Sequence, residues 1–156
     1  MLRSRRISEV GSKAYGPQRS WMRWRRKTGM PGEIKYYFDS YAIVAVLDDA
    51  EAYRRFNVAE GVTTTLNLME TQYALYKKGV KEAEIKRALD DLSPMCIGFS
   101  EGDCFEAVRF RYANRRKRLS YFDCLGYILS EKNEVPFLTG DKEFEGLENV
   151  EFVRIE

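Results

Sequence analysis

The sequence predicts an α/β fold, in which helices flank a mainly parallel sheet of four or five strands. Short runs rich in β-branched and aromatic residues alternate along the chain with longer segments of helical periodicity, as they do in repeated strand–helix units. The stretch 34–47, IKYYFDSYAIVAVL, joins an apolar strand directly to an apolar helix. Both elements are therefore expected to be covered, as they would be in a three-layer sandwich.

Five segments have the composition of strands. They are short, rich in β-branched or aromatic residues, and bounded by Gly, Pro or polar residues. In chain order they are 34–38 (IKYYF), 62–65 (VTTT), 95–99 (MCIGF), 135–139 (VPFLT) and 150–155 (VEFVRI). Pro136 suits the opening of its strand, because proline cannot donate a hydrogen bond within a sheet. The alternating apolar residues of the last segment are typical of an edge strand.

Five segments between these strands are predicted to be helices, and glycine or proline follows the second and the third. In chain order they are 40–47, 66–78, 81–92, 101–118 and 121–132, with 48–57 expected to continue the first as a surface helix. In the fourth helix, the expected apolar side carries Phe105, Val108 and Tyr112. Ser120 is a suitable N-cap for the fifth helix.

The composition is that of one globular domain. The chain has 156 residues, of which 44% are hydrophobic and 32% are charged, within the usual range for such domains. No apolar run approaches the roughly 20 residues that span a bilayer, and the basic N-terminus lacks the apolar core of a signal peptide. We therefore expect a cytoplasmic protein with no membrane partner.

The charge divides the chain into a basic arm at residues 1–32 and an acidic domain at 33–156. The arm has nine Lys/Arg and one Glu, which leaves 17 basic and 23 acidic residues for the domain. Trp21 and Trp24 are spaced to share one face of a short helical turn, and arginines interleaved with tryptophans can bind nucleic acid. Two alternatives remain open: the arm docks on its own domain or on a second copy, or the protein starts at Met30.

Histidine is absent from the chain. Its absence excludes Ser-His-Asp triads, Cys-His dyads and HExxH zinc sites. Any hydrolysis must then use carboxylates, other nucleophiles or a metal. Carboxylates together with a hard cation, Mg²⁺ or Mn²⁺, are the simplest combination that fits this composition.

Four acidic residues lie at strand ends or between apolar residues. Asp39 and Asp141 each follow a predicted strand, so both are expected at the edge of the sheet where parallel sheets bind ligands. Glu70 and Asp123 lie on helices among apolar neighbours, where a charge is less expected than on a solvated face. Each has an ordinary alternative explanation, such as a helix cap for Asp39 or a turn for Asp141. As a set, they predict a Mg²⁺ or Mn²⁺ site, because crowded carboxylates need a neutralising cation.

These acids lie in four motifs that resemble the PIN-domain family of ribonucleases, in particular toxin nucleases of the VapC type. The motifs are a strand-ending Asp followed by a small polar residue, a helical Glu, an Asp early in a helix, and T-x-D-x-x-F after a strand. The matching residues are Asp39 with Ser40, Glu70, Asp123 in LSYFD, and Thr139, Asp141 and Phe144. The resemblance covers residues 34–155 and leaves the arm outside the family pattern.

The resemblance implies metal-dependent endonucleolytic cleavage of RNA, frequent homodimers and inhibition by an antitoxin protein. The implied catalytic and metal-binding residues are Asp39, Glu70, Asp123 and Asp141. Candidates for orienting these carboxylates through hydrogen bonds are Ser40, Asn67 and Thr139. Candidates for holding RNA phosphates are Arg115, Arg116, Lys117, Arg118 and Lys142. The four consecutive basic residues could instead form a solvated helix end that complements the helix dipole.

Two other functions fit parts of the same pattern. Receiver domains and haloacid-dehalogenase-like domains also use strand-end aspartates and Mg²⁺, but they have no place for the helical acids Glu70 and Asp123. A non-catalytic PIN-like module that binds RNA or protein stays open as the alternative.

Overall fold

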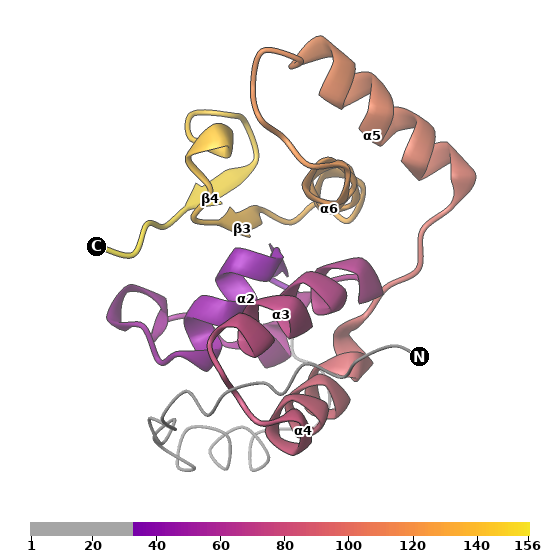
Figure 1. Ribbon diagram of the computed structural model, residues 1–156. Coiled ribbons are helices and arrows are strands. Elements are labelled where there is room, and N and C mark those ends of the chain that lie inside the picture. Colours follow the sequence, from indigo (N-terminus) through magenta and orange to yellow (C-terminus); the bar gives the residue numbers. More distant parts are fainter. Residues whose placement is uncertain (1–32) are drawn as a thin grey trace, which may run out of the picture.

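The computed structural model describes residues 33–156, which form a parallel four-stranded sheet with helices on both faces (Figure 1). The strand order is β2-β1-β3-β4. The strands are β1 (Tyr36–Phe38), β2 (Gly61–Val62), β3 (Phe137–Thr139) and β4 (Val150–Phe152). The predicted α/β sandwich is confirmed, with the last strand at an edge. The arm at 1–32, with the helical turn expected around Trp21 and Trp24, lies outside the described residues.

Side-chain caps fix where most of the α-helices begin. The helices are α2 (Ser40–Leu47), α3 (Thr65–Lys77), α4 (Glu82–Leu92), α5 (Glu101–Ala113) and α6 (Tyr121–Lys132). Short 3-10 turns are η1 (Glu51–Tyr53), η2 (Val58–Glu60), η3 (Ser93–Met95) and η4 (Lys142–Phe144). A side-chain oxygen of the preceding residue accepts a backbone N–H at the start of α2, α3, α5 and α6, which satisfies a donor that the helix itself leaves free. Within the described residues, the helices fall short of the length and apolarity that a membrane span requires.

Successive residues of the central strands point into two separate cores, as the alternation of a strand requires. Phe38 and Leu138 pack in the core that lies against α2, α3 and α4. Tyr37 and Phe137, their neighbours in β1 and β3, pack in the core against α5 and α6. These two groups of helices lie on opposite sides of the sheet (Figure 1). The burial on both faces explains why these strands are apolar throughout.

Gly126 lets α6 approach the sheet closely. A Cβ atom at this position would lie 2.8 Å from Cε1 of Tyr37 and 3.0 Å from Cε2 of Phe137, closer than carbon atoms pack without strain. Gly126 is one turn after Asp123 on the same helix. The close approach therefore also sets how near Asp123 comes to the end of β1.

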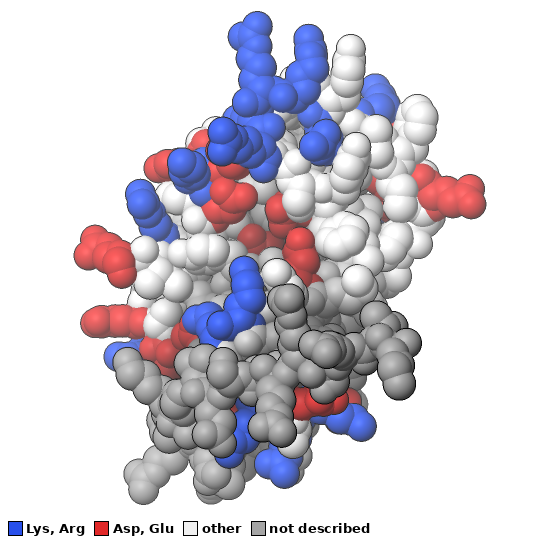
Figure 2. Space-filling view, in the orientation of Figure 1, with Lys and Arg blue, Asp and Glu red and all other residues white. Residues whose placement is uncertain are grey.

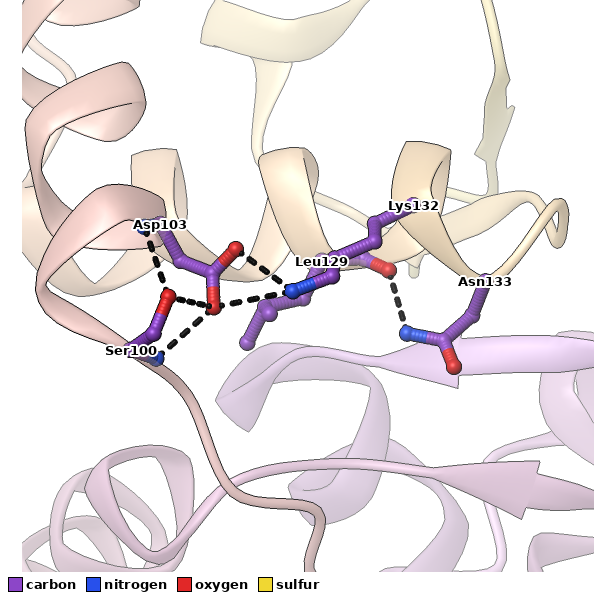
Figure 3. A network of polar contacts seen from close by, with 5 residues as sticks. All are labelled: Ser100, Asp103, Leu129, Lys132 and Asn133. Carbon is purple, nitrogen blue, oxygen red and sulfur yellow. Dashed lines mark hydrogen bonds and ion pairs between the residues drawn. The ribbon is translucent and has the colours of Figure 1, made fainter.

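Polar contacts join the start of α5 to the end of α6 (Figure 3). The carboxylate of Asp103 accepts hydrogen bonds from the backbone N and the hydroxyl of Ser100, at 2.7 and 2.8 Å. The Nζ atom of Lys132 lies 2.9 Å from Asp103 Oδ1. The Ser100 backbone N–H, followed by Lys132 and the Ser100 hydroxyl, lowers the pKa of Asp103 to about 2. Asn133 closes α6 by donating to the carbonyl of Leu129, at 2.8 Å.

Two segments lack the secondary structure predicted for them. Residues 48–57 do not continue α2 as a helix: Asp49 has a φ of 53°, and the chain turns before the short η1. Residues 95–99 are not a strand but form a single bridge, between Cys96 and Thr63. Pro94 and Gly98 flank this bridge and shorten the run that could pair.

Helix α5 is shorter than predicted and turns a different face inward. It ends at Ala113 instead of Arg118, because the side chain of Asn114 donates to the Phe110 carbonyl at 2.9 Å. The predicted apolar side is wrong. The side chains expected to be buried are 66%, 51% and 70% exposed, for Phe105, Val108 and Tyr112. Instead, Ala107 is buried against α6, and Phe110 stacks on Tyr127 with ring centroids 4.5 Å apart.

The close approach at Gly126 predicts that Gly126→Ala will lower the free energy of unfolding by about 1–3 kcal/mol, the usual range for overpacking a core. The matched control is Gly102→Ala in α5, where the nearest heavy atom to a new Cβ is 3.6 Å away. This control should be neutral or stabilising by up to about 1 kcal/mol, because alanine favours helix. Urea unfolding of both variants measures the difference, and equal effects would contradict the packing argument.

Candidate active site

Asp39 is buried at the junction of β1 and α2, with 2% of its surface exposed. Its Oδ1 atom accepts the backbone N–H of Ala42 at 2.7 Å and so caps α2. Its Oδ2 atom accepts the hydroxyl of Thr139, the last residue of β3. Both carboxylate oxygens are thus held by fixed donors from two neighbouring elements.

These hydrogen bonds do not offset the cost of burying the Asp39 charge. Burial is the main cause that raises its pKa to about 8; the hydrogen bonds from Thr139 and Ala42 act against it, and the charges of Asp123 and Asp141 add to it. A buried carboxylate that also faces like charges favours its neutral form. The charges of Asp123 and Asp141 therefore both act on Asp39.

Asp123 occupies the same local position as Asp103, yet its pKa moves the opposite way. Each is the third residue after a serine N-cap, and each backbone N–H donates to that serine's hydroxyl. The Ser120 hydroxyl also donates to Asp123 Oδ2, at 2.6 Å. The pKa of Asp123 is nevertheless raised, by burial first and by the charge of Asp141. Two features set this difference: Asp103 has the stronger cap and an ion pair with Lys132, whereas Asp123 is buried beside another acid.

Glu70 is half-buried on α3, and its Oε2 atom is buried with no hydrogen-bond partner among the described residues. Burial raises its pKa, and so does the charge of Asp123, while the side chains of Ser40 and Asn67 lower it. Glu70 and Asp123 therefore interact electrostatically. The two side chains that lower the pKa of Glu70 come from the first turn of α2 and from one turn earlier on its own helix.

Asp141 follows β3 and caps η4, where its Oδ1 atom accepts the backbone N–H of Glu143 at 3.0 Å. Its own backbone N–H donates to the Thr139 hydroxyl at 3.0 Å. Thr139 thus bridges two acids, since the same hydroxyl donates to Asp39. The turn that was the ordinary explanation for Asp141 is present, together with this link to Asp39.

All four acids are connected electrostatically, with Asp123 coupled to each of the other three. Figure 2 shows acidic side chains gathered near the middle of one face, with basic side chains along the edge above them. Within residues 33–156, no three Asp, Glu, Cys or His side chains are close enough to form a metal-binding group. The four carboxyl groups thus influence one another electrostatically without meeting as a ready-made group of ligands among the described residues.

The basic residues at 115–118 lie in the turn between α5 and α6, not at a helix end as predicted. Lys117 donates to the backbone carbonyl of Glu143 at 2.6 Å, and the backbone N–H of Arg118 donates to the Glu143 carboxylate at 3.2 Å. These contacts fix the basic turn beside η4, two residues from Asp141. Lys142, in the same 3-10 turn, is exposed.

Sequence periodicity did not single out Tyr37 and Thr64, which adjoin the acids. The hydroxyls of both donate to Oδ1 of Asn67, at 2.7 and 3.0 Å. Tyr37 lies in an apolar strand, and the apolar ring is enough to explain why it is buried, so the sequence does not indicate a role for its hydroxyl. For Thr64, the sequence does offer one indication, since a threonine just before a helix is a frequent N-cap.

Comparisons with known proteins agree with this architecture. The model of the PIN domain family matches residues 36–150. A toxin-antitoxin complex from Klebsiella pneumoniae is similar in structure, with a TM-score of 0.60 and 16% identity over 75% of this chain and 96% of that chain. PAE2754 from Pyrobaculum aerophilum has a TM-score of 0.56 and 18% identity over 78% of this chain and 92% of that chain. Likeness at these identities shows the fold alone. Among curated proteins, no sequence matches.

The raised pKa of Asp39 predicts how stability depends on pH in metal-free buffer. Between its ordinary value of 3.8 and about 8, the folded state keeps a proton that the unfolded state releases, so stability falls as pH rises. Asp39→Asn removes this loss. We expect it to exceed the native protein in unfolding free energy at pH 8.5 by more than about 1.4 kcal/mol, the value of one pKa unit.

The advantage of Asp39→Asn should shrink toward pH 4, because near its ordinary pKa of 3.8 the carboxyl takes up a proton in the unfolded state as well. Glu145→Gln, at an exposed acid, is the control and should show no such trend. Thermal or urea unfolding in EDTA at several pH values measures both. A gap that is the same at pH 4 and pH 8.5 would show that Asp39 titrates normally.

Proposed function

Because the chain belongs to the PIN-domain family, whose members are generally nucleases, we propose that residues 33–156 form a Mg²⁺- or Mn²⁺-dependent endoribonuclease. The observation that carries this proposal is the contrast between Asp103 and Asp123. Two aspartates at the same position after a serine N-cap have pKa values shifted in opposite directions. Only the second faces other acids, and such crowding favours a bound cation.

The residues present fit a hard divalent cation. All the candidate ligands are carboxylate oxygens, the donors that Mg²⁺ and Mn²⁺ prefer. The buried Oε2 atom of Glu70 has no hydrogen-bond partner among the described residues, so it is available to a cation. Asp39, Glu70 and Asp123 are our candidates for holding the ion, directly or through water, with Asp141 as a fourth acid.

When bound, the ion would supply positive charge and a water of lowered pKa for attack on a phosphodiester. The chain's own part is to hold its carboxylates ready for this chemistry. Thr139 and Ala42 hold the two oxygens of Asp39, and Ser40 and Asn67 act on Glu70. We assign Asp141 to a second metal or to the attacking water.

The basic turn at 115–118 and Lys142 are candidates for binding the RNA backbone. Lys117 and Arg118 hold this turn next to Asp141 through Glu143. The turn therefore brings positive charge beside the acids. RNA phosphates next to a scissile bond at the acids would be attracted by these basic side chains. An RNA substrate also accords with the cytoplasmic location expected from the sequence.

A protein partner and self-association are further parts of the proposal. The similar structure from Klebsiella pneumoniae is titled a toxin-antitoxin complex, which supports an antitoxin as the partner of this chain. The exposed stripe of Phe105, Val108 and Tyr112 on α5 is our candidate surface for a homodimer. Apolar side chains that are gathered on one helix face often mark a protein interface.

Cleavage of a structured RNA in the presence of Mn²⁺ or Mg²⁺ tests the proposed reaction. We expect Asp39→Asn and Asp123→Asn to lower the rate by at least 100-fold, on the order of 3 kcal/mol in the barrier, and EDTA to abolish cleavage. Asp103→Asn is the matched control, because it changes the same position of a serine-capped helix away from the acids. It should lose stability but keep the native rate.

Two results would count against the nuclease. Cleavage that persists in the Asp39 and Asp123 variants, or in EDTA, would overturn the metal-carboxylate mechanism. RNA binding without cleavage, at any metal concentration, would favour the non-catalytic module.

Sedimentation equilibrium tests the homodimer. We expect the native protein to sediment as a dimer and Phe105→Asp as a monomer with an unchanged unfolding midpoint, since Phe105 is exposed in the single chain. Ile155→Asp, at another exposed apolar residue, serves as the control and should stay dimeric. A native monomer, or a dimeric Phe105→Asp variant, would rule out this surface.

A further inference from the structure

The side chain of Asn67 is buried completely at the start of α3. Its Oδ1 atom accepts two hydroxyl hydrogen bonds, from Tyr37 at 2.7 Å and from Thr64 at 3.0 Å. With Oδ1 facing both hydroxyls, the amide nitrogen points away from them. Turning the amide over would direct Oδ1 toward the Glu70 carboxylate, acceptor against acceptor, so the observed orientation is the favourable one.

That nitrogen has no hydrogen-bond partner among the described residues, although it is fully buried. A buried donor without a partner is costly, by about 1–3 kcal/mol, and calls for an explanation. Glu70 lies three residues later on the same helix, and so on the same face. Its Oε2 atom is likewise buried and unpartnered. A free donor and a free acceptor thus lie one helical turn apart.

The Asn67 side chain already acts on this carboxyl group. It lowers the pKa of Glu70, as a donor near a carboxylate does, against the raising effect of burial and of Asp123. Three polar groups thus follow one another: a hydroxyl in β1, an amide in the first turn of α3, and a carboxylate in its second turn. Tyr37 reaches across from the central strand, with its ring stacked on Phe137 at a centroid distance of 5.7 Å.

We propose that Tyr37 is a positioning residue for Glu70: its hydroxyl fixes the Asn67 amide so that Nδ2 is presented to the Glu70 carboxylate. The inference rests on the proposed function, in which Glu70 holds the metal. Tyr37 does not touch the ion or the RNA and acts through Asn67. The role depends on one oxygen atom, since the ring serves the core.

Tyr37→Phe removes that oxygen and keeps the ring. Tyr127→Phe is the matched control: Tyr127 is also buried, also packs against Phe137, and donates to the Glu148 carbonyl at 2.9 Å. Each variant loses one hydroxyl hydrogen bond, which costs a similar amount of stability, about 0.5–1.5 kcal/mol. The two variants therefore differ in their relation to Glu70 rather than in what they do to folding.

The readout is Mn²⁺ affinity, measured from the electron paramagnetic resonance signal of free Mn²⁺, without RNA. We expect Tyr37→Phe to weaken Mn²⁺ binding about 10-fold, the lower end of the usual loss when a group supporting a ligand is removed. Tyr127→Phe should bind as the native protein does. Asn67→Leu should weaken binding at least as much, and adding Tyr37→Phe to it should change nothing further, because the tyrosine acts through the amide.

The Asp39→Asn variant distinguishes a failure of the positioning role of Tyr37 from a failure of the metal site itself. If it weakens Mn²⁺ binding while Tyr37→Phe and Tyr127→Phe both bind as the native protein does, the positioning role is wrong and the metal site stands. If the native protein binds no Mn²⁺, or Asp39→Asn binds it equally well, the metal site is wrong and the positioning role falls with it. Should Asn67→Leu fail to fold, the two tyrosine variants still decide the question.

Discussion

The buried carboxyl group of Asp39 is the constraint around which the end of the sheet is organised. It caps α2, accepts the hydroxyl that ends β3, and carries a pKa raised to about 8. Because β1 lies between β2 and β3, α3 and η4, which follow these two strands, begin on either side of it. Asp123 and Asp141 both add to the cost of the Asp39 charge. This cost is removed when the Asp39 carboxyl carries a proton or, as we propose, when a cation binds beside it.

The rest of the chain tolerates this unfavourable group because two cores hold the sheet from both faces. Gly126 lets α6 lie close on Tyr37, and the cap of α5 is tied to the end of α6 through Asp103 and Lys132. The ion pair of Asp103 with Lys132 lies away from the four acids and gains nothing from a cation. Functional sites often break local rules of stability that the surrounding structure then compensates. The acidic end of this sheet fits that description.

Most of the architecture could be predicted from sequence, because strand composition and helix caps are local. The order of strand and aspartate alone predicted that Asp39 and Asp141 lie at one edge. The inward face of α5 could not be predicted: Ala107 and Phe110 pack on α6, while a more apolar-looking stripe stays exposed. The role we propose for Tyr37 was also beyond sequence, since periodicity explains its ring and says nothing of its hydroxyl. Both failures concern contacts between distant elements.

The most direct test is to locate the metal by anomalous diffraction from crystals soaked in Mn²⁺. We predict a Mn²⁺ peak within coordination distance, about 2.0–2.3 Å, of carboxylate oxygens from Asp39 and Asp123, with Glu70 contributing directly or through one water. Absence of any peak near these acids at saturating Mn²⁺, or a peak held by other residues while the same protein cleaves RNA, would contradict it.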